Sequence, residues 1–175
     1  VALAVVFSFG ALVWGFITSD FSLALVANHS HSTKPMIYKI SGTWGNHEGS
    51  LLLWILILAI YGGVLALGGS AMPMALKARI LAVQGMVTTG FLAFSLFTSN
   101  PFLRLDNIPL DGKGLNPILQ DPGLAIHPPM LYLGYVGLSM ALAFAVAALI
   151  TGEVDRLWAK WMRPWIIAAW CALTC

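Results

Sequence analysis

The fold is decided by residues 123–150, which read GLAIHPPMLYLGYVGLSMALAFAVAALI. No residue from Met130 to Ile150 is charged, and a bilayer core requires about 20 apolar residues in a helix. Pro128 and Pro129 stand directly before this run, and proline suits the first turn of a helix because its missing N–H costs nothing there. The stretch therefore predicts a membrane-spanning helix over 130–150, with His127 just outside its N-terminus.

The rest of the chain has the same apolar character. Apolar residues make up 59% of the 175 residues and charged residues 9%, whereas soluble domains carry about 25% charged residues. Such a chain cannot cover a surface that faces water. Other apolar runs of spanning or nearly spanning length are Val1–Thr18, Leu51–Leu67 and Ile80–Phe97, and a last run begins near Trp165. We predict an all-α, polytopic transmembrane helix bundle of about four spans plus the start of a fifth.

The connectors between these runs differ in length and charge. The short connectors, 68–79 and 151–164, hold five Lys and Arg residues, and the long connectors, 19–50 and 98–129, hold four over more than twice the length. Basic residues in short loops mark the cytoplasmic side, so we expect both long loops on the opposite, outer face. A net charge of +2 is too small to suggest nucleic-acid binding. Membrane lipid is the expected surrounding.

All four histidines, His29, His31, His47 and His127, fall in the long loops. The residue before a proline is pushed toward extended backbone, which would fix the direction of the His127 imidazole, and a neutral imidazole is a good iron ligand. The residues alone favour a capping or loop-packing role for His127 over a ligand role. For His47, in the segment WGNHEGS, a capped helix start and a surface site beside His127 are equally supported.

The pair His29-Ser30-His31 has the H-x-H spacing of a metal site, with zinc as the usual candidate. No third ligand stands nearby in the sequence, so a solvated polar loop is favoured. Nucleotide-binding, zinc-protease and serine-hydrolase motifs are missing from the sequence. A transporter or channel bundle is the alternative function, although its spans offer only scattered polar residues such as Gln84. A purely structural membrane subunit is a third hypothesis.

Several segments, in order along the chain, resemble the CcmF/CycK family of cytochrome c-type biogenesis proteins. The segment WGNHEGSLLLW at 44–54 is similar to the family's W-G-x-H-E-G-S-x-L-L-W signature. Further similar segments are FTSNPF at 97–102, LNPILQDPG at 115–123, HPPMLYLGYVG at 127–137, and RPW at 163–165 followed by AAW at 168–170.

The resemblance implies an inner-membrane haem lyase. Such a protein takes haem from a haem chaperone and attaches it to a C-x-x-C-H apocytochrome on the periplasmic side, together with thiol-handling and presenting subunits. His127 matches the outer-face axial ligand of the delivered b-type haem, and His47 is a second candidate for contact with it. The resemblance assigns no catalytic acid or base, because His127 would position haem.

The resemblance also implies that residues 1–175 are a partial membrane domain. The chain begins at Val1 and ends at Cys175, each inside an apolar run. We expect the family's tryptophan-rich haem-handling segment, the partner histidine of His127 and the ligands of a second, structural haem beyond residue 175. We expect the piece to be inactive as a lyase when isolated.

Overall fold

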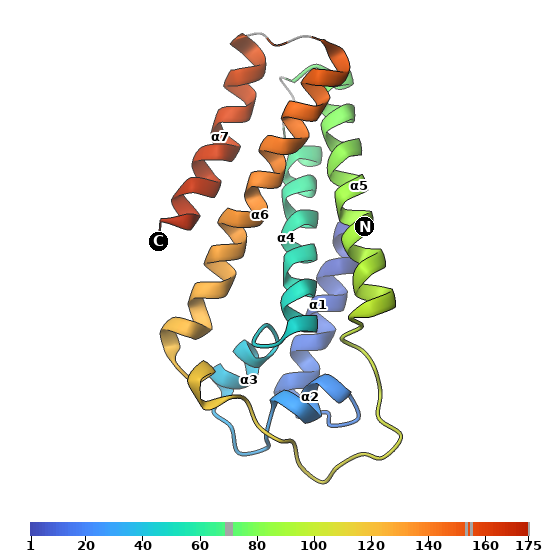
Figure 1. The fold of residues 1–175 in the computed structure, drawn as a ribbon, viewed down its shortest axis with the longest axis vertical. Helices are drawn as coiled ribbons and strands as arrows, with labels where there is room; N and C mark the ends of the chain where they lie inside the picture. The colour runs from blue at the N-terminus through green and yellow to red at the C-terminus, as the bar shows by residue number, and fades with distance from the viewer. Residues whose placement is uncertain (69–71, 153, 155, 175) are drawn as a thin grey trace. The chain divides into compact units, whose positions relative to one another are not determined.

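The structure, a computed structural model, describes residues 1–68, 72–152, 154 and 156–174. In this part of the chain every regular element is a helix (Figure 1). Three helical stretches are long and apolar enough to cross a membrane, and α1 is a shorter apolar helix. The predicted all-α class is therefore confirmed. The elements are α1 (Ala2–Thr18), α2 (Ala24–His29), α3 (Met36–Gly42), α4 (His47–Leu67), α5 (Met74–Thr98), the short 3-10 helix η1 (Pro117–Leu119), α6 (Pro122–Thr151) and α7 (Arg156–Leu173).

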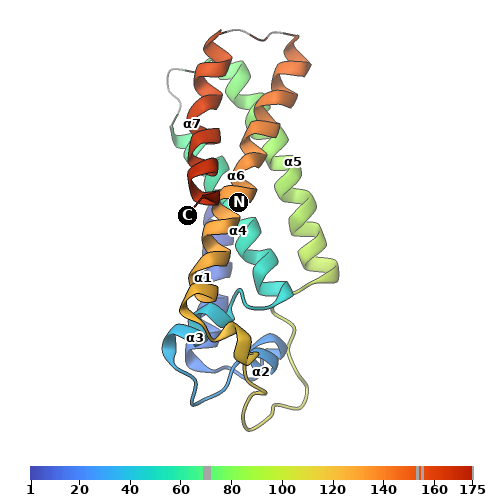
Figure 2. The ribbon, with the colours of Figure 1, turned by 60° about the vertical axis from the view of Figure 1, so that its left-hand side comes forward.

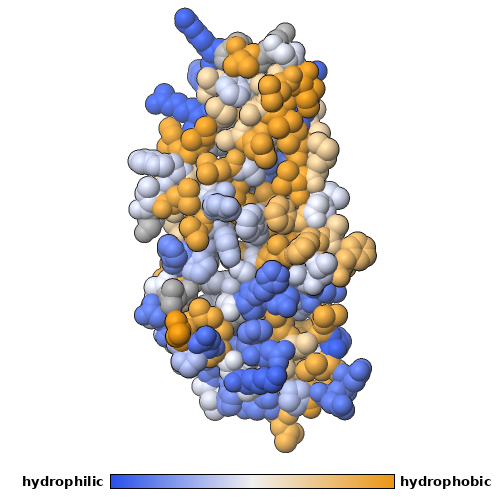
Figure 3. Space-filling view, in the orientation of Figure 1, coloured by the Kyte–Doolittle hydropathy of each residue, from blue (hydrophilic) through white to orange (hydrophobic). Residues whose placement is uncertain are grey.

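The chain forms two compact units. Unit 1 comprises residues 1–2, 54–91 and 129–175, and unit 2 comprises residues 3–53 and 92–128. Unit 1 contains the larger parts of α4, α5 and α6 together with α7, and unit 2 contains all four histidines. On the face shown in Figure 3, apolar side chains cover the helices of unit 1, and hydrophilic side chains gather over the loops of unit 2.

Polar side chains join the helices of unit 1, where α4, α5 and α6 lie side by side (Figures 1 and 2). Gln84 of α5 is 2% exposed, and its Nε2 donates to the Ser139 hydroxyl of α6 at 3.1 Å and to the Leu58 carbonyl of α4 at 3.4 Å. The Trp158 indole of α7 donates to the Phe144 carbonyl of α6 at 3.0 Å. Hydrogen bonds of this kind stabilise packing where lipid offers no competing partner.

The core of unit 2 joins α1 to the segments that follow it. Leu12 and Phe16 of α1 are fully buried and belong to one cluster with Leu23, Val26 and Leu52, among others. The two long connectors also pair with each other through backbone hydrogen bonds: Ala24 N–H donates to the Leu103 carbonyl, and Lys113 N–H donates to the Ala27 carbonyl. The long loops are therefore parts of one packed unit.

Two helices begin earlier than their apolar runs predicted. Helix α4 begins at His47 instead of Leu51, because the Asn46 side chain caps it by accepting a hydrogen bond from the Gly49 N–H at 2.7 Å. Helix α6 begins at Pro122 instead of Met130. The Asp121 carboxylate accepts from the Gly123 N–H at 2.8 Å, and proline occupies the first helical position. The last eight residues of the predicted connector 98–129 are therefore helical.

The remaining boundaries differ for a related reason. Helix α5 begins at Met74, six residues before the apolar run at Ile80, and α7 begins at Arg156 and continues through Pro164. Lys77 in the first turn of α5 reaches back and donates to the Ala66 and Gly68 carbonyls at the end of α4. Basic side chains near a helix C-terminus stabilise its free carbonyls. Apolar runs mark only the lipid-compatible part of a helix, and its polar ends extend beyond them.

Candidate functional site

His127 lies in the second turn of α6, and its side chain is exposed. The structure corrects the expectation that it stands just outside a helix N-terminus, because Asp121 and Pro122 start the helix earlier. Among the described residues, neither ring nitrogen of His127 has a hydrogen-bond partner or an ion-pair partner. The imidazole is therefore presented on a helical surface with both nitrogens free for an incoming group.

The backbone beside His127 is anchored by Trp44. The Trp44 indole N–H donates to the Ala125 carbonyl at 3.0 Å. In an uninterrupted helix the N–H of the residue four positions later would occupy that carbonyl, but position 129 is a proline without an N–H. The indole thus satisfies an acceptor that the proline leaves open. This bond holds the WGNHEGS segment against the helical turn that carries His127.

The WGNHEGS segment is itself tightly constrained. The Asn46 amide donates to the Gly42 carbonyl at 2.7 Å and its oxygen caps the first turn of α4. Gly49 is buried against the backbone of Thr43, and a Cβ at Gly49 would overlap the Thr43 carbonyl oxygen. Only glycine fits there without a shift of the backbone. Much of this motif therefore sets the shape of the turn that positions Trp44 and His47.

His47 is the first residue of α4, and its ring is exposed. Its Nε2 lies 3.1 Å from the hydroxyl of Ser99, which is 6% exposed. This contact joins the WGNHEGS segment to the Ser99-Asn100-Pro101 segment that follows α5. In contrast to His127, one ring nitrogen of His47 is already engaged by the protein.

His29 and His31 are each held by local partners. The Nδ1 of His29 lies 3.0 Å from the Leu25 carbonyl. The Nδ1 of His31 accepts from the Thr33 N–H at 3.3 Å, and its Nε2 lies 3.4 Å from the Asp111 carboxylate. Among the described residues, no group of three or more His, Cys, Asp or Glu side chains could hold a metal ion. The polar-loop interpretation of the H-x-H pair fits these contacts.

Asp111 ties the two long loops together. Its carboxylate accepts from the Ser32 hydroxyl at 2.6 Å and from the Ser32 N–H at 2.9 Å. The hydrogen bonds from Ser32 lower the pKa of Asp111 below its usual value, with smaller contributions from the Gly112 N–H and the nearby His31. The Asp111 carboxylate therefore stays ionised and holds the loop that contains His31.

A polar cavity of about 420 Å³ lies in unit 2 beside this link. Lys34 and Lys113 are both lining residues of this cavity. Burial lowers the pKa of Lys34 to about 8, with a smaller effect from Lys39. The Lys34 amine donates to the His29 carbonyl at 2.8 Å. The cavity is lined by His31, Thr33, Lys34, Pro35, Lys113, Gly114, Leu115 and Gln120.

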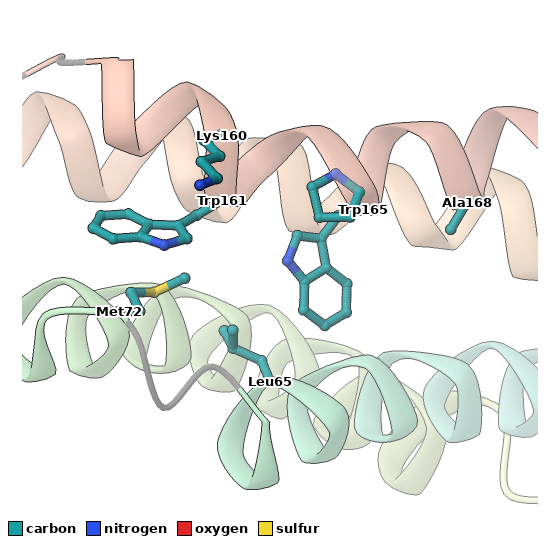
Figure 4. Close-up of a pocket in the computed structure, with 7 residues that line it drawn as sticks. Leu65, Met72, Lys160, Trp161, Trp165 and Ala168 are labelled. Atoms are coloured by element: carbon teal, nitrogen blue, oxygen red, sulfur yellow. The ribbon is translucent and has the colours of Figure 1, made fainter.

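A second cavity, of about 560 Å³, lies within unit 1 and is mostly apolar. Figure 4 shows Trp161 and Trp165 of α7 projecting toward Met72 and Leu65 on the opposite wall. Among the described lining residues, Lys160 is the charged one and none is a histidine. This cavity therefore offers apolar and aromatic surface and no imidazole ligand.

Comparison with known proteins places the chain in a family. Residues 44–175 match the family model described as cytochrome C assembly protein. The chain belongs to this family. The match begins at Trp44, the residue that anchors the turn carrying His127, and it extends over all of α4 to α7. The resemblance to CcmF and CycK that the sequence motifs indicated is thereby confirmed.

Individual members of the cytochrome c assembly family are similar over nearly the whole chain. The cytochrome c-type biogenesis protein ccl1 of Rhodobacter capsulatus is 64% identical over 95% of this chain and 26% of its own length. CcmF of Escherichia coli is 50% identical over 95% of this chain and 26% of its own length. A solved structure of the cytochrome c haem lyase CcmF covers 99% of this chain and 27% of that protein, with a TM-score of 0.81 and 33% identity. The chain spans about a quarter of the length of these relatives.

The structure brings the segments of His47 and His127 together, which the family motifs alone did not indicate. His47 and His127 lie in the same unit, and the Trp44–Ala125 bond connects their segments. Sequence reasoning missed the roles of Trp44, Ser99 and Asp121. For Asp121 a signal existed, since an Asp before a Pro is a common helix start. For Trp44, the available signal was the second proline at 129, which leaves a carbonyl in need of a donor.

Proposed function

We propose that the protein works as a haem lyase of cytochrome c maturation, and that His127 is an axial ligand for the substrate haem. The observation that carries this proposal is the state of the His127 imidazole. It is exposed, both of its nitrogens are free among the described residues, and its backbone is anchored by Trp44. The family membership supports the same function, since a similar solved protein carries the name cytochrome c haem lyase.

A lone histidine fits haem better than it fits a bare metal ion. Structural zinc sites use four protein ligands and catalytic zinc sites use three, and the described residues hold no such group. In haem the porphyrin already supplies four nitrogens, so one or two protein side chains complete the coordination. His127 can therefore serve as a single axial ligand. The second ligand is proposed to come from the rest of a longer protein.

The chemistry proposed for the full protein is thioether formation. Each cysteine thiol of the C-x-x-C-H apocytochrome adds across one haem vinyl group: sulfur bonds to one vinyl carbon and the thiol hydrogen goes to the other. This addition consumes no oxidant or reductant. The described residues contribute positioning, because fixed orientation of two reactants removes about 7–11 kcal/mol from a barrier in favourable cases.

The surroundings of the site follow from the same proposal. The chain is proposed to lie in the bacterial inner membrane with loops 19–50 and 98–129 on the periplasmic side, where the apocytochrome is presented. A haem chaperone would deliver b-type haem, and thiol-handling subunits would present the apocytochrome. We also propose that residues 1–175 supply one part of the membrane domain of a longer lyase. A second, structural haem would belong to the remainder of that lyase.

His47 is proposed as a secondary contact only. Its Nε2 is engaged by Ser99, so the ring would bind iron through Nε2 only after losing this hydrogen bond. A role in shaping the surface beside His127 requires no such change. This distinction predicts different outcomes for the two histidines when each is replaced.

The proposal is tested by replacing His127 with alanine in the full-length protein and measuring the yield of holocytochrome c in cells. We expect His127→Ala to abolish the yield. The matched control is His29→Ala, which removes an imidazole from the same unit whose Nδ1 already contacts the Leu25 carbonyl. We expect the control to retain most of the yield. Wild-type maturation in the His127→Ala strain would contradict the proposed role.

A further inference from the structure

The polar cavity of unit 2 has a marked excess of positive charge. Lys34 is 9% exposed and Lys113 is exposed, and both residues line the cavity. Among the described residues, neither lysine forms an ion pair with a carboxylate. The neighbouring carboxylate, Asp111, is engaged by the Ser32 hydroxyl and N–H and by His31.

A buried ammonium without a counter-charge is costly. The effect is visible in Lys34, whose pKa falls to about 8 because burial removes water from the amine and Lys39 adds a second positive charge nearby. One of its three N–H donors is used by the His29 carbonyl at 2.8 Å, and an ammonium group has two more. The amine therefore has two N–H donors available for a further acceptor.

The cavity is formed by backbone pairing and does not depend on flexible surface side chains alone. Lys113 N–H donates to the Ala27 carbonyl at 2.8 Å, and Gly114 N–H donates to the Ser30 carbonyl at 3.0 Å. A Cβ at Gly112 would overlap the Ser30 carbonyl, so the two loops approach at a glycine. This pairing holds the Lys113 backbone opposite the segment that carries Lys34.

We propose that this cavity binds an anionic group of the carboxylate or phosphate class between the amines of Lys34 and Lys113. Such a group would supply the missing counter-charge and would accept hydrogen bonds from both lysines. A volume of about 420 Å³ accommodates a group of that size.

One source of such a group follows from the site already described, and this part rests on the proposed function. Gln120 lines the cavity and stands two residues before the start of α6. His127 lies five residues into that helix, about 8 Å along its axis at 1.5 Å per residue. Haem carries two propionate carboxylates, so a haem held by His127 could place one of them toward this cavity. The other source is a free anion such as phosphate.

The first experiment measures the anion site without haem. The full-length protein in lipid nanodiscs is treated with an amine-acylating ester, and the labelling of each lysine is followed by mass spectrometry. Inorganic phosphate then replaces chloride at equal ionic strength. At a phosphate concentration four times its dissociation constant, mass action gives about fivefold slower labelling of Lys34 and Lys113. Lys160, in the other unit, serves as the internal control and should be unchanged.

The second experiment identifies the source by comparing haemin with haemin dimethyl ester, whose propionates are uncharged. Affinity is measured for the wild type, Lys113→Gln and Arg104→Gln. Both substituted side chains are exposed and belong to unit 2, so packing is preserved. If a propionate occupies the cavity, Lys113→Gln and esterification each weaken haem binding about tenfold. Together they weaken it little further, and Arg104→Gln has no effect.

The outcomes separate this inference from the proposed function. Protection of both lysines by phosphate, without discrimination between haemin and its ester, supports the anion site with a free anion as its source. Failure of haem to bind at all contradicts the proposed function and leaves the phosphate result to decide on the cavity. Equal labelling of both lysines with and without phosphate and haemin overturns the inference.

Discussion

Replacement of Trp44 by phenylalanine tests the anchoring of the His127 turn most directly within the fold. Phenylalanine keeps most of the apolar volume of the side chain and removes the indole N–H. The Ala125 carbonyl would then lose its 3.0 Å hydrogen bond. No backbone N–H replaces the indole, because position 129 is proline.

The magnitude follows from the burial of the acceptor. Ala125 is 4% exposed, and leaving a buried acceptor without a partner costs about 1–3 kcal/mol. A second substitution, Pro129→Ala, restores an N–H four residues after Ala125. In that background the loss of the indole should cost much less. The double-mutant cycle should therefore give a coupling free energy of about 0.5–3 kcal/mol between positions 44 and 129.

The assay is hydrogen–deuterium exchange of the backbone amides of residues 123–127 of the full-length protein. If this turn opens locally, a loss of 1–3 kcal/mol raises exchange by about 5-fold to 150-fold, since 1.4 kcal/mol is a factor of ten. Exchange in Gly85-containing peptides of unit 1 serves as the internal reference. Unchanged exchange in Trp44→Phe, or an equal effect with and without Pro129→Ala, would refute the anchoring.

Three further predictions concern packing and pH. Gly49→Ala should lower the folded yield in size-exclusion chromatography, because the added methyl group overlaps the Thr43 carbonyl and overpacking costs about 1–3 kcal/mol or more. The control is Gly85→Ala, whose methyl group meets no atom within 4 Å, and its size-exclusion profile should match the wild type. Hydrogen bonds lower the pKa of Asp111 below 3.8, so its stabilisation of the loops is complete above pH 3.8 and is lost as the pH falls through the lower folded-state pKa. Limited proteolysis of residues 98–121 should show this opening of the loop in acid, and Asp111→Asn should open the loop at neutral pH. The pKa of Lys34 is about 8 in the folded protein and 10.5 ordinarily, so between these pH values the unfolded chain binds more protons and the stability of the folded protein should rise with pH. Lys34→Met should remove this rise in thermal unfolding measured over the same pH range. A rise that persists in Lys34→Met would contradict the assignment.

Composition and apolar runs predicted the fold class because only long apolar helices are compatible with a lipid environment in this chain. A membrane-crossing helix needs a long uncharged stretch, and such stretches stand out in the sequence. Helix ends carry a weaker signal. Asn46 and Asp121 cap α4 and α6. Both residues lie in polar segments that the bounds of the apolar runs assigned to loops. The amphipathic helix α7 was placed too late for the same reason, since its first turns hold Arg156 and Lys160.

The candidate site was predictable in part. His127 stood out through its position beside two prolines and through the family motif, and the structure leaves its ring free. Its position inside α6 was not predicted, because two local signals conflict. A residue before proline disfavours helix, whereas Asp121-Pro122 favours a helix start, and the second signal prevails in the structure. The Trp44–Ala125 bond joins residues 81 positions apart. Such a pairing depends on tertiary packing, which no local pattern specifies.

The most direct test of the central claim is the visible absorption spectrum of haem bound to the full-length protein, compared between the wild type and His127→Gly before and after addition of free imidazole. The substitution leaves a space where the imidazole side chain was. If His127 is an axial ligand, the spectrum of the substrate haem changes in His127→Gly, and imidazole restores it toward that of the wild type. An unchanged spectrum in His127→Gly would contradict the assignment.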